Sequence, residues 1–252
     1  MKYTYQNAES INQWKKKYGL SWMEPIDHET YINALHGKWD ITVTPVKPVP
    51  HHWLDDISGK KVLGLASGGG QQIPILSALG AECTVFDISK EQLESERFVA
   101  NREGYAVNIV QGDMTERFPF EDESFDFIIH PVSNHYIEDV YPVFQECYRV
   151  LKHGGNLICG LDTGIYWMLD FINDEERVVH SLPLNPLKDK SAYDELIEND
   201  MALQFSHTLE EQIGGQLKAG FQLLDIYEDT NGNGLLHEKN IPTFISTRSK
   251  KV

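Results

Sequence analysis

The residues best suited to chemistry form a glycine-rich run. The sequence GLASGGGQQ (64–72) joins a short apolar segment to one with helical spacing. Glycines let the backbone turn sharply and approach a ligand, and the start of a helix offers unpaired N–H groups. The run alone is a weak signal, since a glycine turn also serves tight strand-to-helix packing. It fits neither a P-loop, which needs a following Lys-Ser/Thr pair, nor the G-x-G-x-x-G dinucleotide fingerprint.

Two carboxylates follow the glycine run at the ends of later apolar segments. Asp87 comes about 17 residues after Gly70, where a carboxylate can accept hydrogen bonds from both hydroxyls of a ribose. Asp113, in the run GDM (112–114), can accept from an adenine amino group, while Met114 offers a backbone N–H and apolar contact. Alternatively, Asp87 caps the helix that follows it and Asp113 forms a turn. Three such pieces in order favour a nucleoside site, because ligands bind at the carboxyl edge of an open α/β sheet.

These residues need strands and helices that bring them to one edge. Apolar runs predict strands at 61–65, 81–86, 107–110, 125–129 and 156–161. Helical spacing predicts helices at 72–79, 90–103 and 140–151, the last ending at Gly154-Gly155. A helix at 209–219 and strands at 221–227 and 243–247 then suggest an antiparallel closing hairpin. Alternating strands and helices imply parallel pairing and a doubly wound α/β sheet.

Over residues 61 to about 161 the sequence resembles the class I S-adenosylmethionine-dependent methyltransferases, especially the UbiE-like group with its Methyltransf-11-type domain. The resemblance rests on VLGLASGGG, TVFDIS, VQGDM, FPFEDESFDFII and FQECYRVLKHGG. It implies a Rossmann-like, mostly parallel seven-stranded sheet with an antiparallel last strand. It also implies S-adenosylmethionine as cofactor, with ribose on Asp87, adenine against Ile88 and Met114, and the adenine amino group near Asp113. The full set of expected cofactor contacts is Ala66, Ser67, Gly68, Gly69, Gly70, Asp87, Ile88, Gln92, Gly112, Asp113, Met114, His130 and Pro131.

Two residues of the glycine run depart from the pattern of that family. Gly64 stands where the family usually has Asp or Glu, which removes an acceptor beneath the methionine part of the cofactor. Ala66 stands where the family has glycine, so a Cβ is added at a crowded turn. His153 replaces the usual proline of LKPGG, in what we expect to be a helix-ending turn.

Candidates for catalysis lie in the loop after the fourth predicted strand, HPVSNHYIED (130–139). In the resembling family this loop faces the methyl group, and His135 and Tyr136 are the residues best placed to contact the acceptor. The competing interpretation of His135 is a loop histidine bonded locally. Methyl transfer depends mainly on orientation and desolvation, and a base is needed only when the acceptor must lose a proton.

Two regions fall outside the strand-helix rhythm, and we expect them to cover the site. Residues 1–55 are predicted to form a helical and extended cap, and residues 56–252 the Rossmann-like domain. An insertion at about 165–206 interrupts that domain. Both regions are rich in aromatic residues, some of which we expect to line an apolar acceptor pocket.

The overall composition limits which kinds of binding partner we expect. A formal net charge of −16 disfavours nucleic acid, because such a surface repels a phosphate backbone. No apolar run is long enough to cross a bilayer, the first residues do not resemble a secretory signal, and three cysteines suggest reduced thiols; we therefore expect a cytoplasmic protein without a membrane partner. No metal is expected, since the EF-hand-like DTNGNG (229–234) has Asn240 at its twelfth position.

The sequence thus predicts an S-adenosylmethionine-dependent methyltransferase acting on an unidentified, small-molecule acceptor. The alternative is a protein that binds S-adenosylmethionine or S-adenosylhomocysteine without transferring a methyl group, an interpretation motivated by Gly64 and Ala66. An NAD-dependent oxidoreductase is disfavoured by the poor dinucleotide fingerprint and by the GDM element. Neither the acceptor nor the oligomeric state is predicted.

Overall fold

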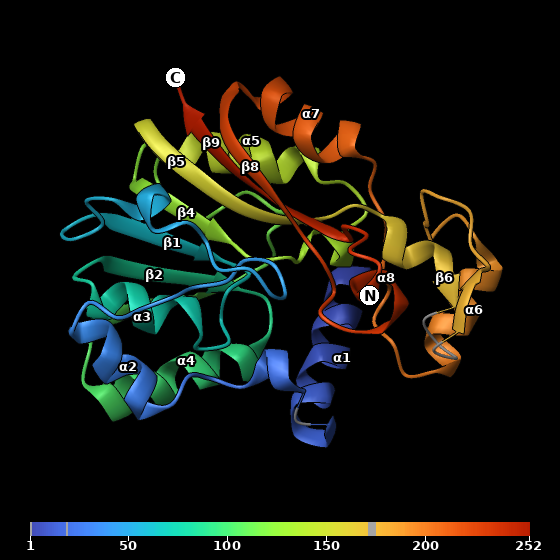
Figure 1. Ribbon diagram of the computed structural model, residues 1–252, viewed down its shortest axis with the longest axis horizontal. Helices are drawn as coiled ribbons and strands as arrows, with labels where there is room; N and C mark the ends of the chain where they lie inside the picture. Colours follow the sequence, from blue (N-terminus) through green and yellow to red (C-terminus); the bar gives the residue numbers. More distant parts are fainter. Residues whose placement is uncertain (1, 19, 171–174) are drawn as a thin grey trace.

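The structure, a computed structural model, describes residues 2–18, 20–170 and 175–252, and its centre is a twisted seven-stranded sheet (Figure 1). The strands are β1 (Lys61–Leu65), β2 (Glu82–Asp87), β3 (Val107–Gln111), β4 (Phe125–His130), β5 (Leu151–Asp162), β8 (Phe221–Asp229) and β9 (Phe244–Lys251). Their order in the sheet is β3-β2-β1-β4-β5-β9-β8. β1 to β5 pair in parallel, whereas the last strand, β9, is antiparallel to both neighbours, as predicted.

Helices cover both faces of the sheet because its central strands carry apolar side chains on both faces. Val62 and Val85 belong to the core beneath α3 (Gln72–Ala78) and α4 (Lys90–Glu103). Leu63 and Phe86 point the other way and join the core beneath α5 (Tyr141–Val150) and α7 (Leu209–Ala219). Successive side chains of a strand point to opposite faces, so a strand buried on both sides is apolar throughout. The two helical layers appear below and above the sheet in Figure 1.

The N-terminal segment adds α1 (Tyr3–Tyr18) and α2 (His28–Leu35), joined by the short helix η1 (Ser21–Met23) and followed by η2 (His51–Leu54). α2 packs on α3, and α1 packs on α4. α1 also contacts the ends of two strands, because Thr4 bonds to Asp113 after β3 and Asn12 bonds to Ser89 after β2. α1 therefore lies at the carboxyl edge of the sheet.

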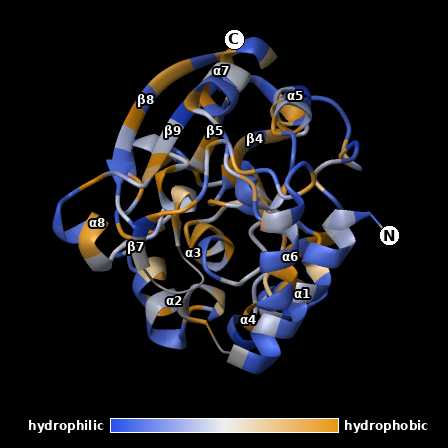
Figure 2. Ribbon diagram, turned by 90° about the vertical axis from the view of Figure 1, so that its right-hand side faces the viewer, coloured by the Kyte–Doolittle hydropathy of each residue, from blue (hydrophilic) through white to orange (hydrophobic). Residues whose placement is uncertain are grey.

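The insertion after β5 forms a separate small layer. It contains η4 (Ile165–Met168), the two-stranded antiparallel pair β6 (Leu169–Asp170) and β7 (Glu175–Val178), and α6 (Lys190–Glu198), followed by an extended stretch at 202–207. Figure 2, which faces this side of the molecule, shows α6 beside α1. Leu196 of α6 and Tyr3 of α1 share an apolar cluster with Phe205. The insertion and the N-terminal segment thus pack on each other.

Several predicted boundaries differ from the structure, and the largest difference is at the start of the fifth strand. Helix α5 ends at Val150, and the following residues up to Gly155 begin β5 instead of forming a helix-ending turn. Leu151 pairs with Phe125, and the register then shifts so that Phe127 pairs with Asn156. An irregularity in β5 accommodates the glycines, with Gly154 at φ 83°. A short helix, α8 (Gly234–Glu238), was also not predicted. No helix within the described ranges has the length and apolarity needed to cross a membrane.

Candidate functional site

The glycine run leaves β1 in a tight turn that brings it against the end of β2. Ala66 has φ 48°, a left-handed conformation that glycine adopts at lower cost, which explains the glycine of the related pattern. Gly68 packs against Asp87, since a Cβ on Gly68 would lie 3.1 Å from Asp87 Oδ2. The bare backbone instead donates from Gly68 N to that oxygen at 3.0 Å. Glycine at this position therefore permits the contact between the loop and the carboxylate.

Asp87 ends β2 as predicted, and its carboxylate faces the loop. It is 9% exposed, and its second oxygen accepts from Ser89 N at 2.8 Å. Burial raises the pKa of Asp87, and the N–H donors of Ser89 and Gly68 act in the opposite direction. The cap of α4 is Ser89, which accepts from Gln92 N, so the alternative role of Asp87 as helix cap is wrong. A carboxylate has about four acceptor positions, so the backbone donors Gly68, Ser89 and Ile88 leave room for a hydroxyl donor.

Gln92 lies in the first turn of α4 and carries an unsatisfied acceptor. Its side chain is 8% exposed, and Oε1 is buried without a hydrogen-bond partner among the described residues. A buried acceptor left unpaired costs about 1–3 kcal/mol, so it is suited to a donor supplied by a ligand. Gln92 thus belongs to the same edge as Asp87, one helical turn farther along the chain.

Asp113 lies after β3, and its carboxylate is fully engaged within the protein. Oδ1 accepts from the backbone and hydroxyl of Thr115, while Oδ2 accepts from the Thr4 hydroxyl at 2.6 Å and pairs with Lys2 at 3.0 Å. A carboxylate has about four acceptor positions, and these contacts fill them. Asp113 therefore both forms the turn considered as its alternative and holds α1. An adenine amino group reaches it only if Thr4 or Lys2 gives way.

The predicted adenine neighbours follow these carboxylates directly in the chain. Ile88 and Met114 are half-buried beside Asp87 and Asp113. Gly112 N donates to the Asp87 carbonyl at 3.0 Å, which ties the end of β3 to the end of β2. A Cβ on Gly112 would lie 2.3 Å from the Phe86 ring, so only glycine fits this close approach.

A buried carboxylate from α4, that of Glu96, contacts the end of the glycine run. Glu96 is fully buried and accepts from the Tyr105 hydroxyl at 2.7 Å and from the Gly70 backbone. Burial raises the pKa of Glu96 to about 7. A side chain at Gly64 would itself meet Ile73, because a Cβ there lies 2.7 Å from Ile73 Cδ1. Sequence reasoning missed Glu96, although an acidic residue on the apolar face of the predicted helix at 90–103 was visible.

The loop after β4 is locked by a chain of side-chain hydrogen bonds. His130 is fully buried, with Nδ1 3.1 Å from the Leu65 carbonyl and Nε2 2.8 Å from Asn134 Oδ1. Asn134 donates to Gln212 Oε1 at 3.0 Å, and Gln212 Nε2 donates to the carbonyl of Asp162 at 2.8 Å. The chain joins the ends of β1, β4 and β5 to α7. His130 thus fixes the edge through its imidazole, whereas Pro131 beside it is half-buried.

His135 and Tyr136, the predicted catalytic candidates, lie farther along this loop, in the short helix η3 (Asn134–Tyr136). Their rings lie 4.0 Å apart between centroids, and the His135 ring lies 5.2 Å from that of Trp167. His135 Nδ1 is buried without a hydrogen-bond partner in the described part of the chain. Burial, followed by the proximity of His207, lowers the pKa of His135 to about 3, so its imidazole is neutral. Burial also raises the pKa of Tyr136.

The structure therefore separates the predicted residues into two groups. The glycine run, Asp87, Gln92 and Asp113 meet at the carboxyl ends of β1 to β3. His135 and Tyr136 pack instead beneath the insertion, where Phe205 N donates to the His135 carbonyl at 2.7 Å. α1 bridges the two groups, because Asn7 donates to the Tyr136 carbonyl while Thr4 holds Asp113.

Comparisons with known proteins agree with this geometry. Residues 63–159 match the family model described as a methyltransferase domain. The chain is 44% identical to the uncharacterized methyltransferase YbaJ of Bacillus subtilis, over 97% of this chain and 98% of that protein. It is 30% identical to the ubiquinone/menaquinone biosynthesis C-methyltransferase UbiE of Bartonella henselae, over 50% of this chain and 48% of that protein.

Solved structures show the same fold. An S-adenosylmethionine-dependent methyltransferase from Mesorhizobium loti superposes with a TM-score of 0.62 at 18% identity, covering 79% of this chain and 94% of that one. A similar protein from Listeria monocytogenes gives a TM-score of 0.61 at 19% identity. Sequence kinship over the full length, the shared domain and the order of the sheet agree, and the chain belongs to the class I S-adenosylmethionine-dependent methyltransferases.

Proposed function

We propose that this methyltransferase holds S-adenosylmethionine at the carboxyl edge of β1 to β3 and transfers its methyl group to a small-molecule acceptor. The proposed binding of the cofactor is supported mainly by one observation: Gly68, Asp87 and Gln92 lie at the same edge of the sheet. Asp87 keeps room for a hydroxyl donor, and the buried Gln92 Oε1 lacks a partner within the described residues. These groups fit a ribose, because its hydroxyls can donate hydrogen bonds to the free acceptor oxygens.

Bound S-adenosylmethionine supplies an electrophilic methyl group on a sulfonium, so the chain has mainly to bind, orient and exclude water. Ser67 to Gly70 provide the backbone of the cradle, and Ala66 sets its turn. Asp87 orients the ribose, while Ile88, Gly112 and Met114 bound the adenine. Asp113 receives the adenine amino group when α1 yields. His130 and Pro131 form the floor at the end of β4, held by the chain of bonds to Asp162.

The acceptor side is formed by His135, Tyr136 and the insertion, with residues 1–55 and 165–206 acting as the cover. Because burial keeps His135 neutral and leaves Nδ1 unpaired among described residues, His135 can accept a hydrogen bond from the acceptor. The net charge of −16 supports a small molecule rather than nucleic acid as acceptor. The free, buried Cys83, Cys147 and Cys159 support a cytoplasmic site of action.

Binding and turnover test this function separately. Isothermal titration of S-adenosylmethionine and S-adenosylhomocysteine should show binding of both to the wild-type chain. Turnover of methyl-labelled S-adenosylmethionine on a panel of small metabolites should then yield a labelled product. Binding without transfer to any member of a broad panel would favour the alternative of a non-catalytic binding protein. Absence of binding to either compound would overturn the proposal.

A further inference from the structure

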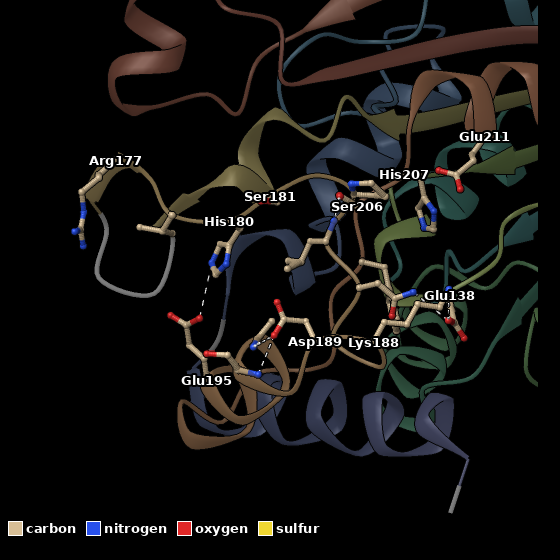
Figure 3. Close-up of a pocket in the computed structure, with 17 residues that line it drawn as sticks. Glu138, Arg177, His180, Ser181, Lys188, Asp189, Glu195, Ser206, His207 and Glu211 are labelled. Atoms are coloured by element: carbon tan, nitrogen blue, oxygen red, sulfur yellow. Dashed lines mark hydrogen bonds and ion pairs between the residues drawn. The ribbon is translucent and has the colours of Figure 1, made fainter.

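A cavity of about 740 Å³ opens between the insertion, the loop after β4 and the start of α7. Figure 3 shows His207 and Glu138 on one side of it, His180 and Glu195 on the other, and Asp189 between them. The volume lies in the range of sites for small molecules, about 300–1,000 Å³. Its lining combines polar side chains with a few apolar ones, so a hydrophilic ligand fits it better than a long hydrocarbon chain.

The cavity adjoins the predicted catalytic loop, because Glu138 of that loop lines it. Leu184 and Ala192 line it and pack on Trp167, whose ring lies 5.2 Å from that of His135. Phe205, also in the lining, donates its backbone N–H to the His135 carbonyl. The loop leaves β4 at its carboxyl end, the edge at which open α/β sheets bind their ligands.

Among the lining residues, His207 has an imidazole nitrogen that can accept a proton. Its side chain is 4% exposed, and Nε2 lies 3.1 Å from the Asn134 carbonyl and 3.0 Å from the Ile137 carbonyl. Carbonyl oxygens only accept, so Nε2 carries the proton and Nδ1 of the neutral ring is the lone-pair nitrogen. Nδ1 has no hydrogen-bond partner among residues 2–18, 20–170 and 175–252, and His207 lines the cavity.

The buried carboxylate of Asp162 is a neighbour of His207. Asp162 is 1% exposed at the end of β5, and it accepts from Gly164 N at 2.9 Å and Trp167 Nε1 at 3.1 Å. Burial raises the pKa of Asp162, while attraction to His207 acts in the opposite direction.

The charges around the cavity favour a cation. Four carboxylates line it, Glu138, Asp189, Glu195 and Glu211, against the two cationic side chains Arg177 and Lys188. Lys188 already pairs with Glu138 at 3.3 Å. Asp189 uses Oδ1 to cap α6 through Ser191 and Ala192, and Oδ2 has no hydrogen-bond partner in the described part of the chain. An occupant with a protonated amine complements this surplus of negative charge.

We infer that the cavity binds the methyl acceptor, that the acceptor is a small polar amine, and that His207 Nδ1 removes its proton. This inference rests on the proposed methyl transfer. The ammonium gives one proton to Nδ1, which leaves a lone pair on nitrogen. The new N–C bond then forms as the C–S bond of the sulfonium breaks, and its electron pair passes to sulfur. The products are a methylated amine and a thioether, with the proton on His207.

Three matched probes test the charge preference: benzylamine, benzyl alcohol and benzoate share a ring and differ in charge. Ligand-observed NMR on the full chain with S-adenosylhomocysteine should show benzylamine binding at least tenfold more tightly than the other two. The double variant Asp189→Asn with Glu195→Gln should lose that preference. Equal binding of the three probes, or an undiminished preference in the double variant, overturns the inference.

The role of His207 has its own readout. With ¹³C-labelled histidine, benzylamine should shift a ring signal that is missing from His207→Gln, whose amide can still donate to the two carbonyls. Benzylamine that binds without moving this signal would contradict His207 as the proton acceptor. Isothermal titration of S-adenosylhomocysteine separates the two proposals. If wild type fails to bind it, the proposed function falls, and if it binds while benzylamine does not, only this inference falls.

Discussion

The carboxyl edge of β1 to β3 and the insertion cavity are constructed differently. At the sheet edge, Gly68, Asp87 and Ser89 are held by short-range backbone contacts that follow from where strands end. In the insertion, His207 is held by carbonyls about 70 residues away, and the cavity exists only because α6 and the stretch at 202–207 pack on α1. At a strand end, functional side chains are positioned by contacts within the sheet edge. In the insertion, they are positioned by packing against segments that are distant in sequence.

This difference suggests how one fold serves many acceptors. The proposed cofactor edge, at the carboxyl ends of β1 to β3, is formed by parallel strands that also form the core. Substitutions there therefore affect both stability and cofactor binding. The insertion packs through its own small clusters around Trp167 and Leu196, apart from the two main cores. Its lining can therefore change without disturbing the cofactor edge. The variants below test whether the two regions are as independent as their contacts indicate.

The largest effect is expected from Glu96, which buries a carboxyl behind the glycine run. Its pKa rises from 4.5 to about 7 in the folded chain. The unfolded chain loses this proton first, so the stability contribution present below pH 4.5 is lost as the pH rises to about 7. The loss is roughly 3 kcal/mol. Glu96→Gln should therefore be more stable than wild type at pH 8 and differ less at pH 5, as measured by urea unfolding. Parallel profiles for the two chains would show that Glu96 does not carry this proton.

Removing the carboxylate of Asp87 should weaken cofactor binding without changing the insertion cavity. Asp87→Ala is expected to weaken S-adenosylhomocysteine binding by about 1.5–3 kcal/mol, roughly ten- to hundredfold, because bonds to a charged acceptor are lost. Isothermal titration measures this, with Asp194→Ala on α6 as a matched control that leaves affinity unchanged. A folded Asp87→Ala chain with wild-type affinity would place the ribose elsewhere.

Thr4 tests the bridge between the two regions. Its hydroxyl occupies Asp113 Oδ2, which an adenine amino group must share or take. Thr4→Val removes the donor but keeps the shape, so S-adenosylhomocysteine affinity should rise two- to tenfold, about 0.5–1.5 kcal/mol. Glu9→Gln, exposed on the same helix, is the control. A fall in affinity would instead mean that the bond between Thr4 and Asp113 persists in the complex.

The smallest effect is expected at Ala66. Its left-handed φ of 48° costs roughly 1 kcal/mol, which glycine would recover while losing a similar amount to the entropy of the unfolded chain. Ala66→Gly should therefore change the free energy of unfolding by less than about 1 kcal/mol. Ala100→Gly, inside α4, should cost at least about 1 kcal/mol. Equal losses at both positions would argue against strain at Ala66.

Much of the cofactor edge could be predicted from sequence. The strand at 61–65 and the helices at 90–103 and 209–219 have the predicted bounds, because each is apolar or amphipathic with a clear start and stop. Asp87 and Asp113 follow strand ends as expected. The beginning of β5 was mistaken for a turn, since Gly154-Gly155 normally ends a helix and here lies in an irregular strand.

The acceptor side could not be predicted in the same way. Nothing near His207 in the sequence signals chemistry, because its partners Asn134, Ile137 and Asp162 come from other elements. Nor do the residues around Asp113 indicate that it accepts a hydrogen bond from Thr4, which is 109 residues away. Local periodicity reports which face of an element is buried, but not which distant group it meets.

The most direct test of the central claim is a crystal structure of the chain with S-adenosylhomocysteine. We expect the ribose hydroxyls to lie within hydrogen-bond distance of the Asp87 carboxylate, with Gln92 Oε1 paired to a donor and the insertion cavity open beside His207. A nucleoside seated in the insertion cavity, or bound with no contact to Asp87, would contradict the division of the molecule into a cofactor edge and an acceptor lid.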